Sequence, residues 1–156
     1  MTTDHSPSLY NRKAHFEYHV LDSFEVGLAL AGTEVKSIRA GKANLQDAFA
    51  RIERGEVWLY HMHISPYDQG NRYNVDPVRQ RKMLMHRKEI DKLEIKLREK
   101  GFTLVPLKLY FTRGKVKIQL AIAKGKTMGD KRDTLRKKEA DRDVERALRN
   151  HQKGRF

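Results

Sequence analysis

Hydrophobic and polar residues alternate with the period of β-strands over much of the first 123 residues. Two such rows follow one another: Val105, Leu107, Leu109 and Phe111, and then Val116, Ile118, Leu120 and Ile122. Each row predicts a strand with one apolar face. The link 112–115 is short and contains Gly, which predicts a β-hairpin, and Pro106 predicts a bulge or an edge position in the first strand.

Other segments extend this pattern. Residues 49–60 predict a second hairpin that turns at 53–56, and residues 15–22 and 33–39 predict further strands. Residues 24–31 are compatible with a short helix.

One segment has a helical period instead. Its apolar residues recur at spacings of three and four, and basic residues lie off that stripe: Met83, His86, Ile90, Leu93 and Leu97. Gly101 is the expected C-cap. Several short strands with one amphipathic helix predict a mainly β fold, a small antiparallel OB-fold-like β-barrel with flanking α-helices.

The apolar pattern stops near Lys124. Residues 124–156 contain four Leu, Ile, Val or Phe residues, with 12 Lys and Arg against six Asp and Glu. They carry a narrow helical stripe of Ala140, Val144, Ala147 and Leu148, and such an isolated helix is marginal in water. We therefore expect a tail that is disordered when free and folds on a polyanion. The alternative is a solubilising tail without structure in any state.

The predicted organisation is a flexible leader at 1–10, a barrel at 11–123 and a basic tail at 124–156. The whole chain has 33 Lys and Arg against 20 Asp and Glu, a net charge of +13, and no cysteine. This charge predicts a polyanionic partner, with nucleic acid ahead of a lipid surface. The missing cysteines exclude disulfides and thiol chemistry, and the absence of a signal or membrane-spanning segment predicts a cytoplasmic protein without membrane contact.

Catalytic signatures are absent from the sequence: it has no nucleophile elbow and no phosphate loop. His61 and His63 would share a strand face and suggest a metal-dependent nuclease, but no third ligand lies nearby except Asp68. His15 and His19 have the spacing of a helical zinc pair in a segment that predicts a strand. We predict neither enzyme activity, metal nor cofactor.

Basic and aromatic residues favour RNA binding. Arg79, Arg81 and Lys82 lie together in sequence, and Tyr18, Tyr67, Tyr73 and Tyr110 offer rings on which bases could stack. The alternative interpretation places Tyr18 and Tyr110 at the rim of the core and the arginines on a solvated face.

Six segments, in order, resemble the SsrA-binding protein family, SmpB. They are NRKAHFEYHV (11–20), GLALAGTEVKSIRAGKANLQDAF (27–49), GEVWLYHMHISPY (55–67), RQRKMLMHRKEI (79–90), GFTLVPLKLYF (101–111) and GKVKIQLAIAKGKTMGDKR (114–132). The match keeps one register from about residue 11 to residue 146.

This resemblance implies a function. Members of the family bind the tRNA-like domain of transfer-messenger RNA, the SsrA RNA, and bring it to stalled 70S ribosomes for trans-translation. They stand in for the missing anticodon arm and codon, and their tail becomes helical in the empty mRNA channel. Elongation factor Tu with GTP takes part indirectly, through the alanylated RNA, and we expect a monomer. The alternative is a general ribosome-associated RNA-binding or RNA-chaperone barrel.

The resemblance also implies site residues. The expected RNA-binding set is Asn11, Arg12, Lys13, His15, Glu25, Lys36, Arg39, Arg81, Lys82, Leu84, Lys115 and Lys117. The expected tail set, for the decoding centre and mRNA channel, is Lys124, Lys126, Asp130, Lys131, Arg132, Arg136, Lys137, Lys138, Arg142, Arg146, Ala147 and Leu148.

Overall fold

The computed structural model describes residues 8–68, 74–99 and 101–153. The chain divides into two compact units, Met1–Gly125 and Lys126–Phe156. Most of the predicted leader, residues 1–7, lies outside the described residues, and so does Tyr73. The last two residues of the predicted leader form β1 (Leu9–Tyr10), which pairs with β8 and so belongs to the sheet.

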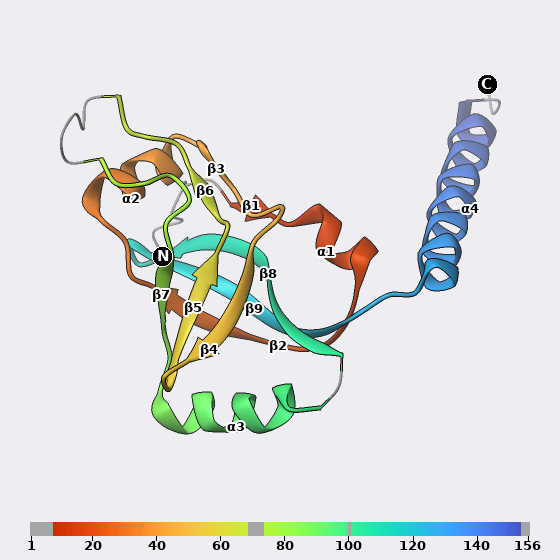
Figure 1. Cartoon of the computed structure of the whole chain (residues 1–156). Helices are drawn as coiled ribbons and strands as arrows, with labels where there is room; N and C mark the ends of the chain where they lie inside the picture. The colour runs from red at the N-terminus through yellow and green to blue at the C-terminus, as the bar shows by residue number, and fades with distance from the viewer. Residues whose placement is uncertain (1–7, 69–73, 100, 154–156) are drawn as a thin grey trace. The chain divides into compact units, whose positions relative to one another are not determined.

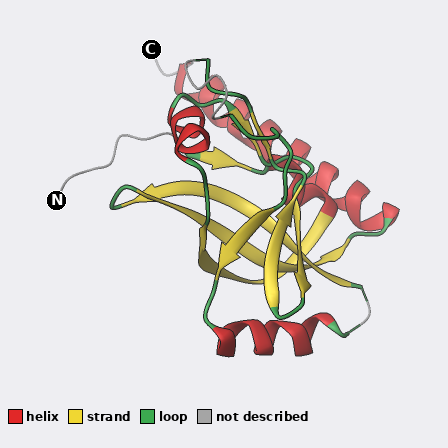
Figure 2. Cartoon of the chain, turned by 60° about the vertical axis from the view of Figure 1, so that its left-hand side comes forward, coloured by secondary structure: helices red, strands yellow, loops and turns green. Residues whose placement is uncertain are grey.

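Six strands of the first unit close into a ring in which every neighbouring pair is antiparallel (Figures 1 and 2). Their order is β8 (Phe102–Thr112), β4 (Phe49–Glu53), β5 (Glu56–Tyr60), β7 (Arg81–Leu84), β2 (Tyr18–Leu28) and β9 (Lys115–Gly125), and β9 pairs again with β8. The short strands β3 (Ala43–Asn44) and β6 (His63–Ile64) form a separate pair. The predicted mainly β fold with an antiparallel barrel is confirmed.

Both predicted hairpins are present, and both turn through two residues. Arg54 and Gly55 link β4 to β5 with φ of 53° and 74°, and Arg113 and Gly114 link β8 to β9 with φ of 51° and 74°. Positive φ at both central residues matches the right-handed twist of the paired strands. Gly supplies this conformation in the second position at low cost.

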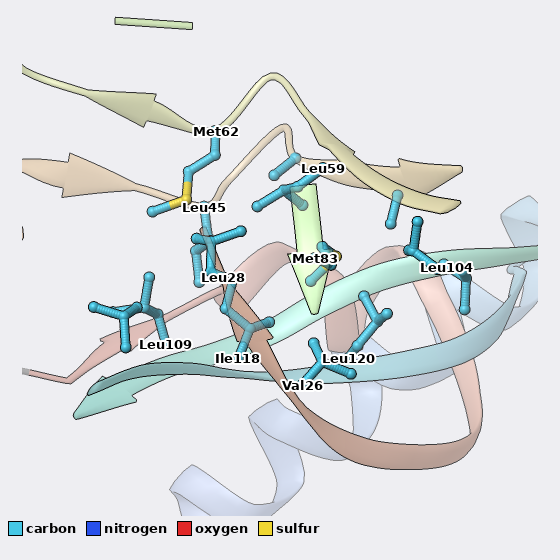
Figure 3. Close-up of a cluster of buried hydrophobic side chains, with 14 of the residues drawn as sticks. Val26, Leu28, Leu45, Leu59, Met62, Met83, Leu104, Leu109, Ile118 and Leu120 are labelled. Carbon is cyan, nitrogen blue, oxygen red and sulfur yellow. The ribbon is translucent and has the colours of Figure 1, made fainter. Parts of the chain in front are cut away.

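The barrel interior is filled by aliphatic side chains from its strands. Leu59, Leu104, Ile118 and Leu120 are completely buried, and Figure 3 shows them facing one another. Helix α3 (Arg87–Leu97) adds Ile90 and Leu93 to this core and covers one end of the barrel (Figure 1).

The bulge predicted at Pro106 is confirmed, because the register between β8 and β9 shifts between Pro106 and Lys108. Because of this bulge, the four apolar residues predicted to share one face of this strand do not do so. Leu109 and Phe111 face the interior, whereas Val105 and Leu107 pack with Ala14 in a second, smaller cluster. The extra residue in β8 reverses which side chains point into the barrel. Val105 and Leu107 therefore lie on the outer face of β8, where Ala14 of helix α1 (Arg12–Glu17) packs against them.

The strand predicted at 33–39 is wrong, since these residues form helix α2 (Gly32–Arg39). The Glu34 carboxylate accepts a hydrogen bond from the Ala31 N–H at 3.0 Å, which satisfies a free donor at the helix start. The buried residues Glu34, Ser37 and Ile38 then follow the helical period. The short helix compatible with 24–31 is also wrong, because β2 runs to Leu28.

The observed boundaries of two further elements differ from the predicted ones by three or more residues. The strand predicted at 15–22 begins only at Tyr18, after α1. The helix predicted from the stripe Met83 to Leu97 begins only at Arg87, because Met83 is a buried residue of β7. It ends at Leu97 with Arg98 as its C-cap, and Gly101 instead takes a φ of +91° in the turn before β8.

The second unit holds one long helix, α4 (Met128–Lys153). Thr127 and Asp130 form a reciprocal capping pair at its start, each N–H donating to the other's side chain at 3.2 Å. From Met128 to Asn150 its side chains are exposed or half-exposed. The sequence predicts that this helix is lost in the free protein, and that expectation stays a prediction.

Candidate nucleic-acid interface

The outer face of β8, β9, β2 and β7 presents two cross-strand rows of residues, most of them polar. In the first row, Gln119 lies opposite both Lys108 and Glu25. In the second row, Lys117 lies opposite both Tyr110 and Gly27, and Leu84 lies opposite Gly27 on β7. We call this surface the polar sheet face and define it by Glu25, Leu84, Lys108, Tyr110, Lys115, Lys117 and Gln119. It brings together four of the residues predicted to bind RNA, namely Glu25, Leu84, Lys115 and Lys117.

Hydrogen bonds and ring contacts join the two rows of the polar sheet face. The Tyr110 hydroxyl donates a hydrogen bond to the Glu25 carboxylate. The Lys108 ammonium lies 5.4 Å from the centre of the Tyr110 ring and 5.1 Å from that of Tyr10. The Gln119 side chain donates to the Ser23 hydroxyl at 3.0 Å. Glu25 therefore has a fixed orientation, with acceptor capacity left for a ligand.

The second row surrounds an exposed leucine. Leu84 is 53% exposed, and a Cβ at Gly27 would lie only 3.2 Å from the Cβ of Leu84. Gly27 therefore allows Leu84 to lie close over β2. A pocket of about 280 Å³ opens beside Leu84, with Lys115 and Lys117 in its wall. An exposed apolar side chain flanked by two ammonium groups suits a nucleotide, whose base is apolar on its faces and whose phosphate is anionic.

The contact between Tyr110 and Glu25 has a spectroscopic consequence. Partial burial and the hydrogen bond to the Glu25 carboxylate raise the pKa of Tyr110 to about 12, from an ordinary 10.0. We expect the Cζ resonance of Tyr110 in ¹³C-tyrosine spectra to titrate close to pH 12. Glu25→Gln should move that midpoint toward 10, since it removes the negative charge that disfavours the phenolate. An unchanged midpoint in this variant would show that the hydrogen bond does not form in solution.

Two members of the predicted RNA-binding set, Asn11 and Arg81, are interior in the structure, and a contact between their side chains and RNA stays a prediction. Asn11 is only 4% exposed, and its side-chain N–H donates to the Pro106 carbonyl at 2.9 Å. Its backbone N–H donates to the Leu107 carbonyl at 2.8 Å. Asn11 thus ties the start of α1 to the bulge of β8. Arg12, Lys13 and His15 follow on α1 and are exposed.

Arg81 is the second interior residue, with an exposure of 0%. Its guanidinium donates to the Glu34 carboxylate at 2.6 Å and to the Met62 carbonyl at 2.6 Å, and Arg79 also pairs with Glu34. Burial alone would raise the pKa of Glu34, but the hydrogen bonds from Arg79, Ala31 and Arg81 outweigh it and hold that pKa below its ordinary value. Arg81 therefore joins α2 to β7, and its guanidinium donates to acceptors inside the protein.

The remaining predicted residues of the first unit are exposed. Lys82 pairs with Glu56 at 3.1 Å on the outer side of the barrel. On α2, the Lys36 ammonium lies 5.4 Å from the Tyr67 ring centre, and the Arg39 guanidinium lies 5.4 Å from that of Phe111. Sequence reasoning missed Lys108 and Gln119 in the row of Glu25, and Tyr10 beside Lys108, because the bulge that aligns them is visible in sequence only as Pro106.

The predicted tail residues lie at the end of β9 and along α4. Lys124 is exposed on β9, and Lys126 donates to the Thr134 hydroxyl at 2.7 Å. Asp130 belongs to the capping pair, so its role in α4 is structural. Lys131 is half-exposed, and the other members are exposed on α4: Arg132, Arg136, Lys137, Lys138, Arg142, Arg146, Ala147 and Leu148.

The candidate histidine pairs do not share an element. His61 lies in the link between β5 and β6 with a φ of 63°, edge-on to Phe49, whereas His63 belongs to β6. His15 lies in α1 and His19 in β2. Across the described part of the chain, no three His, Asp or Glu side chains gather as metal ligands would. Of the helices described, none has the length and apolar character needed to cross a membrane.

Known proteins resemble this chain over most of its length. A family model described as "SmpB protein" matches residues 8–150. The SsrA-binding protein of Desulforamulus reducens is 60% identical over 144 residues, which cover 92% of this chain and 89% of that protein. The SsrA-binding protein of Bacillus subtilis is 58% identical over 144 residues, 92% of each. A solved structure described as "tmRNA-SmpB: a journey to the center of the bacterial ribosome" matches with a TM-score of 0.67 and 47% identity, over 84% of this chain and 96% of that chain.

Proposed function

The chain belongs to the SmpB protein family, and we propose that it binds transfer-messenger RNA and delivers it to stalled ribosomes for trans-translation. The observation that carries this proposal is the polar sheet face, where four residues expected from the family lie on adjacent strands. The body recognises the tRNA-like domain of the RNA and stands in for its missing anticodon arm and codon. The protein acts as an adaptor and catalyses no reaction.

The chemistry of the polar sheet face suits a folded RNA. Lys115 and Lys117 neutralise phosphates, and Leu84 packs against a base or ribose. Glu25 cannot bind a phosphate, but its carboxylate accepts hydrogen bonds from base amino groups or from ribose 2′-hydroxyls. Tyr110 holds that carboxylate in one orientation, so the acceptor is positioned before RNA arrives.

Removing both lysines tests the phosphate contacts. In Lys115→Ala/Lys117→Ala we expect the slope of log affinity for the tRNA-like domain against log salt to become shallower by roughly 1 for each lysine. Lys88→Ala/Lys92→Ala removes the same charge from exposed positions on α3 and should leave the slope nearly unchanged. An equal change in both double variants would mean that net charge, rather than this surface, governs binding.

The tail has a separate task in this proposal. It enters the empty mRNA channel of the 70S ribosome beyond the decoding centre, where its basic residues face the RNA walls. Elongation factor Tu with GTP is a partner only through the alanylated RNA, and the protein works as a monomer in the cytoplasm. The family relationship and the concentration of exposed basic side chains on α4 support this assignment.

Helix α4 should be weakly stable outside that channel. Its side chains are exposed or half-exposed from Met128 to Asn150, and an isolated helix of this kind gains little from packing. We expect its amides in the free protein to exchange with deuterium at least about a hundredfold faster than those in the middle of β8 and β9. Equal protection in the helix and in the barrel would contradict a tail that folds only on its target.

A further inference from the structure

Strand β1 and helix α1 lie beside β8 (Figure 1), and Asn11 is the residue between them. It is only 4% exposed, although the family resemblance counts it among the RNA-binding residues. A buried residue influences a ligand through the exposed side chains that it holds in place. The contacts of Asn11 lead to such side chains, which belong to the polar sheet face.

Asn11 pairs two successive backbone carbonyls at the bulge of β8. Its side-chain N–H donates to the Pro106 carbonyl at 2.9 Å, and its backbone N–H donates to the Leu107 carbonyl at 2.8 Å. Strand partners lie on either side of this point, since Leu104 pairs with β4 and Lys108 pairs with β1. Asn11 therefore fills the gap between these partners and pairs both carbonyls, which stabilises the bulge because buried polar groups are costly when unpaired.

The bulge decides which side chains of β8 face outward. The register against β9 shifts by one residue there, so the alternation before the bulge is opposite to the alternation after it. Leu107 packs on the outer side with Ala14, whereas Leu109 lies inside the barrel. If the strand continued without the bulge, Leu109 would face outward, and Lys108 and Tyr110 would face inward. The polar sheet face therefore depends on this bulge.

We infer that Asn11 is a positioning residue of the polar sheet face, which fixes the bulge of β8 and through it the outward orientation of Lys108 and Tyr110. Lys108 lies directly after the bulge, and Tyr110 lies two residues further and donates to the Glu25 carboxylate. Asn11 thus acts on RNA through Glu25 and Lys108 and not through a contact of its own. This role rests on the proposed function for its ligand, whereas its structural part holds in the protein without RNA.

The protein without RNA tests the structural part. Asn11→Ala removes the bond to the Pro106 carbonyl, and Glu25→Gln gives the reference signal of Tyr110 without its carboxylate partner. We expect the ¹³Cζ resonance of Tyr110 at neutral pH to move in Asn11→Ala toward its position in Glu25→Gln. Leu93→Ala is the control, because it removes a buried side chain of α3 and lowers stability without touching the bulge, and it should leave that resonance in place. An unchanged Tyr110 resonance in Asn11→Ala would overturn the inference.

Asn11→Asp adds a rescue that depends on pH. The protonated carboxyl has nearly the size of the amide and donates an O–H to the Pro106 carbonyl, whereas the ionised carboxylate only accepts. We expect the Tyr110 resonance of this variant to return toward its native position as the pH falls and the carboxyl becomes protonated, and Asn11→Ala to show no such return. The unmodified chain, titrated in parallel, gives the response of Glu25 itself and of the charged groups around Asn11, namely Glu17, Asp47 and Arg51. The same pH response in both variants would contradict the role of the donated hydrogen bond.

RNA binding tests the functional part. In Asn11→Ala we expect affinity for the tRNA-like domain to fall about tenfold, the cost of ordering one or two side chains on binding. The slope against log salt should be retained, because Lys115 and Lys117 are unchanged. Weaker binding with a native Tyr110 resonance would indicate a direct contact of Asn11 with RNA and overturn the inference, and so would native affinity with a shifted resonance. If the unmodified chain itself shows no preference for the tRNA-like domain, the proposed function fails, and the Tyr110 resonance still decides whether Asn11 fixes the bulge.

Discussion

Replacing Arg81 with alanine is expected to lower the free energy of unfolding by about 3–5 kcal/mol, because it removes the buried partner of the Glu34 carboxylate and leaves only Arg79 to pair with that charge. Arg81 is 0% exposed and Glu34 is 3% exposed. The guanidinium also donates to the carbonyls of Met62 and Pro77, at 2.6 and 3.0 Å. Small domains have about 5–15 kcal/mol of stability in total, so this one change removes a large share.

Urea denaturation measures this loss of unfolding free energy, and two further variants show whether the buried ion pair causes it. Lys82→Ala, the next residue on β7, breaks an exposed pair with Glu56 and should cost less than about 1 kcal/mol. Glu34→Gln/Arg81→Met removes both charges and should be less destabilised than Arg81→Ala. A small effect of Arg81→Ala, equal to that of Lys82→Ala, would contradict the interior position of Arg81.

Deleting residues 133–156 is expected to abolish peptide tagging by trans-translation while leaving affinity for transfer-messenger RNA nearly intact. The polar sheet face lies entirely in the unit Met1–Gly125, which keeps its core in the truncated chain. The deleted segment contains eight Lys and Arg against five Asp and Glu. The net charge removed is small, so the general attraction to RNA changes little.

The helix itself is tested by Ala140→Pro, which keeps length and charge but breaks α4 at a cost of about 3 kcal/mol. We expect this variant to lose tagging as the truncation does, and Ala140→Ser, which retains the helix, to keep it. The measurements are gel-shift titration and a tagging assay on ribosomes stalled without a stop codon. Parallel loss of RNA affinity and tagging in the truncated chain would contradict the division of labour between the two units.

The hairpins could be predicted from local sequence because each turn contains a glycine between two alternating segments. Gly55 and Gly114 occupy positions where positive φ is required, and alternating residues flank both turns. The strand predicted at 33–39 was wrong: Val35 and Ile38 are three residues apart, which suits a helix, and the contact that starts this helix is the cap between Ala31 and Glu34. A capping glutamate without a Ser or Thr before it gives little warning in sequence.

The candidate site was predictable only in part, because charge does not reveal burial. Arg81 and Lys82 are adjacent basic residues, and the alternation of β7 sends one into the interior and the other to the surface. The family resemblance predicted Glu25, Leu84 and Lys115 as RNA-binding residues. The structure adds that the strands holding them lie next to one another. Tyr110 was predicted only as one of several candidate stacking residues. Its bond to Glu25 spans 85 positions and depends on the register of three strands.

The barrel unit is proposed to recognise one structured RNA. The most direct measurement is a gel-shift titration of the full chain, at physiological salt, against the tRNA-like domain of transfer-messenger RNA and an unrelated folded RNA of equal length. We predict clear preference for the tRNA-like domain, because Glu25 and Leu84 are proposed to contact bases or riboses in addition to the phosphate contacts proposed for the lysines. Equal affinity for both RNAs would contradict the claim and favour a general RNA-binding barrel.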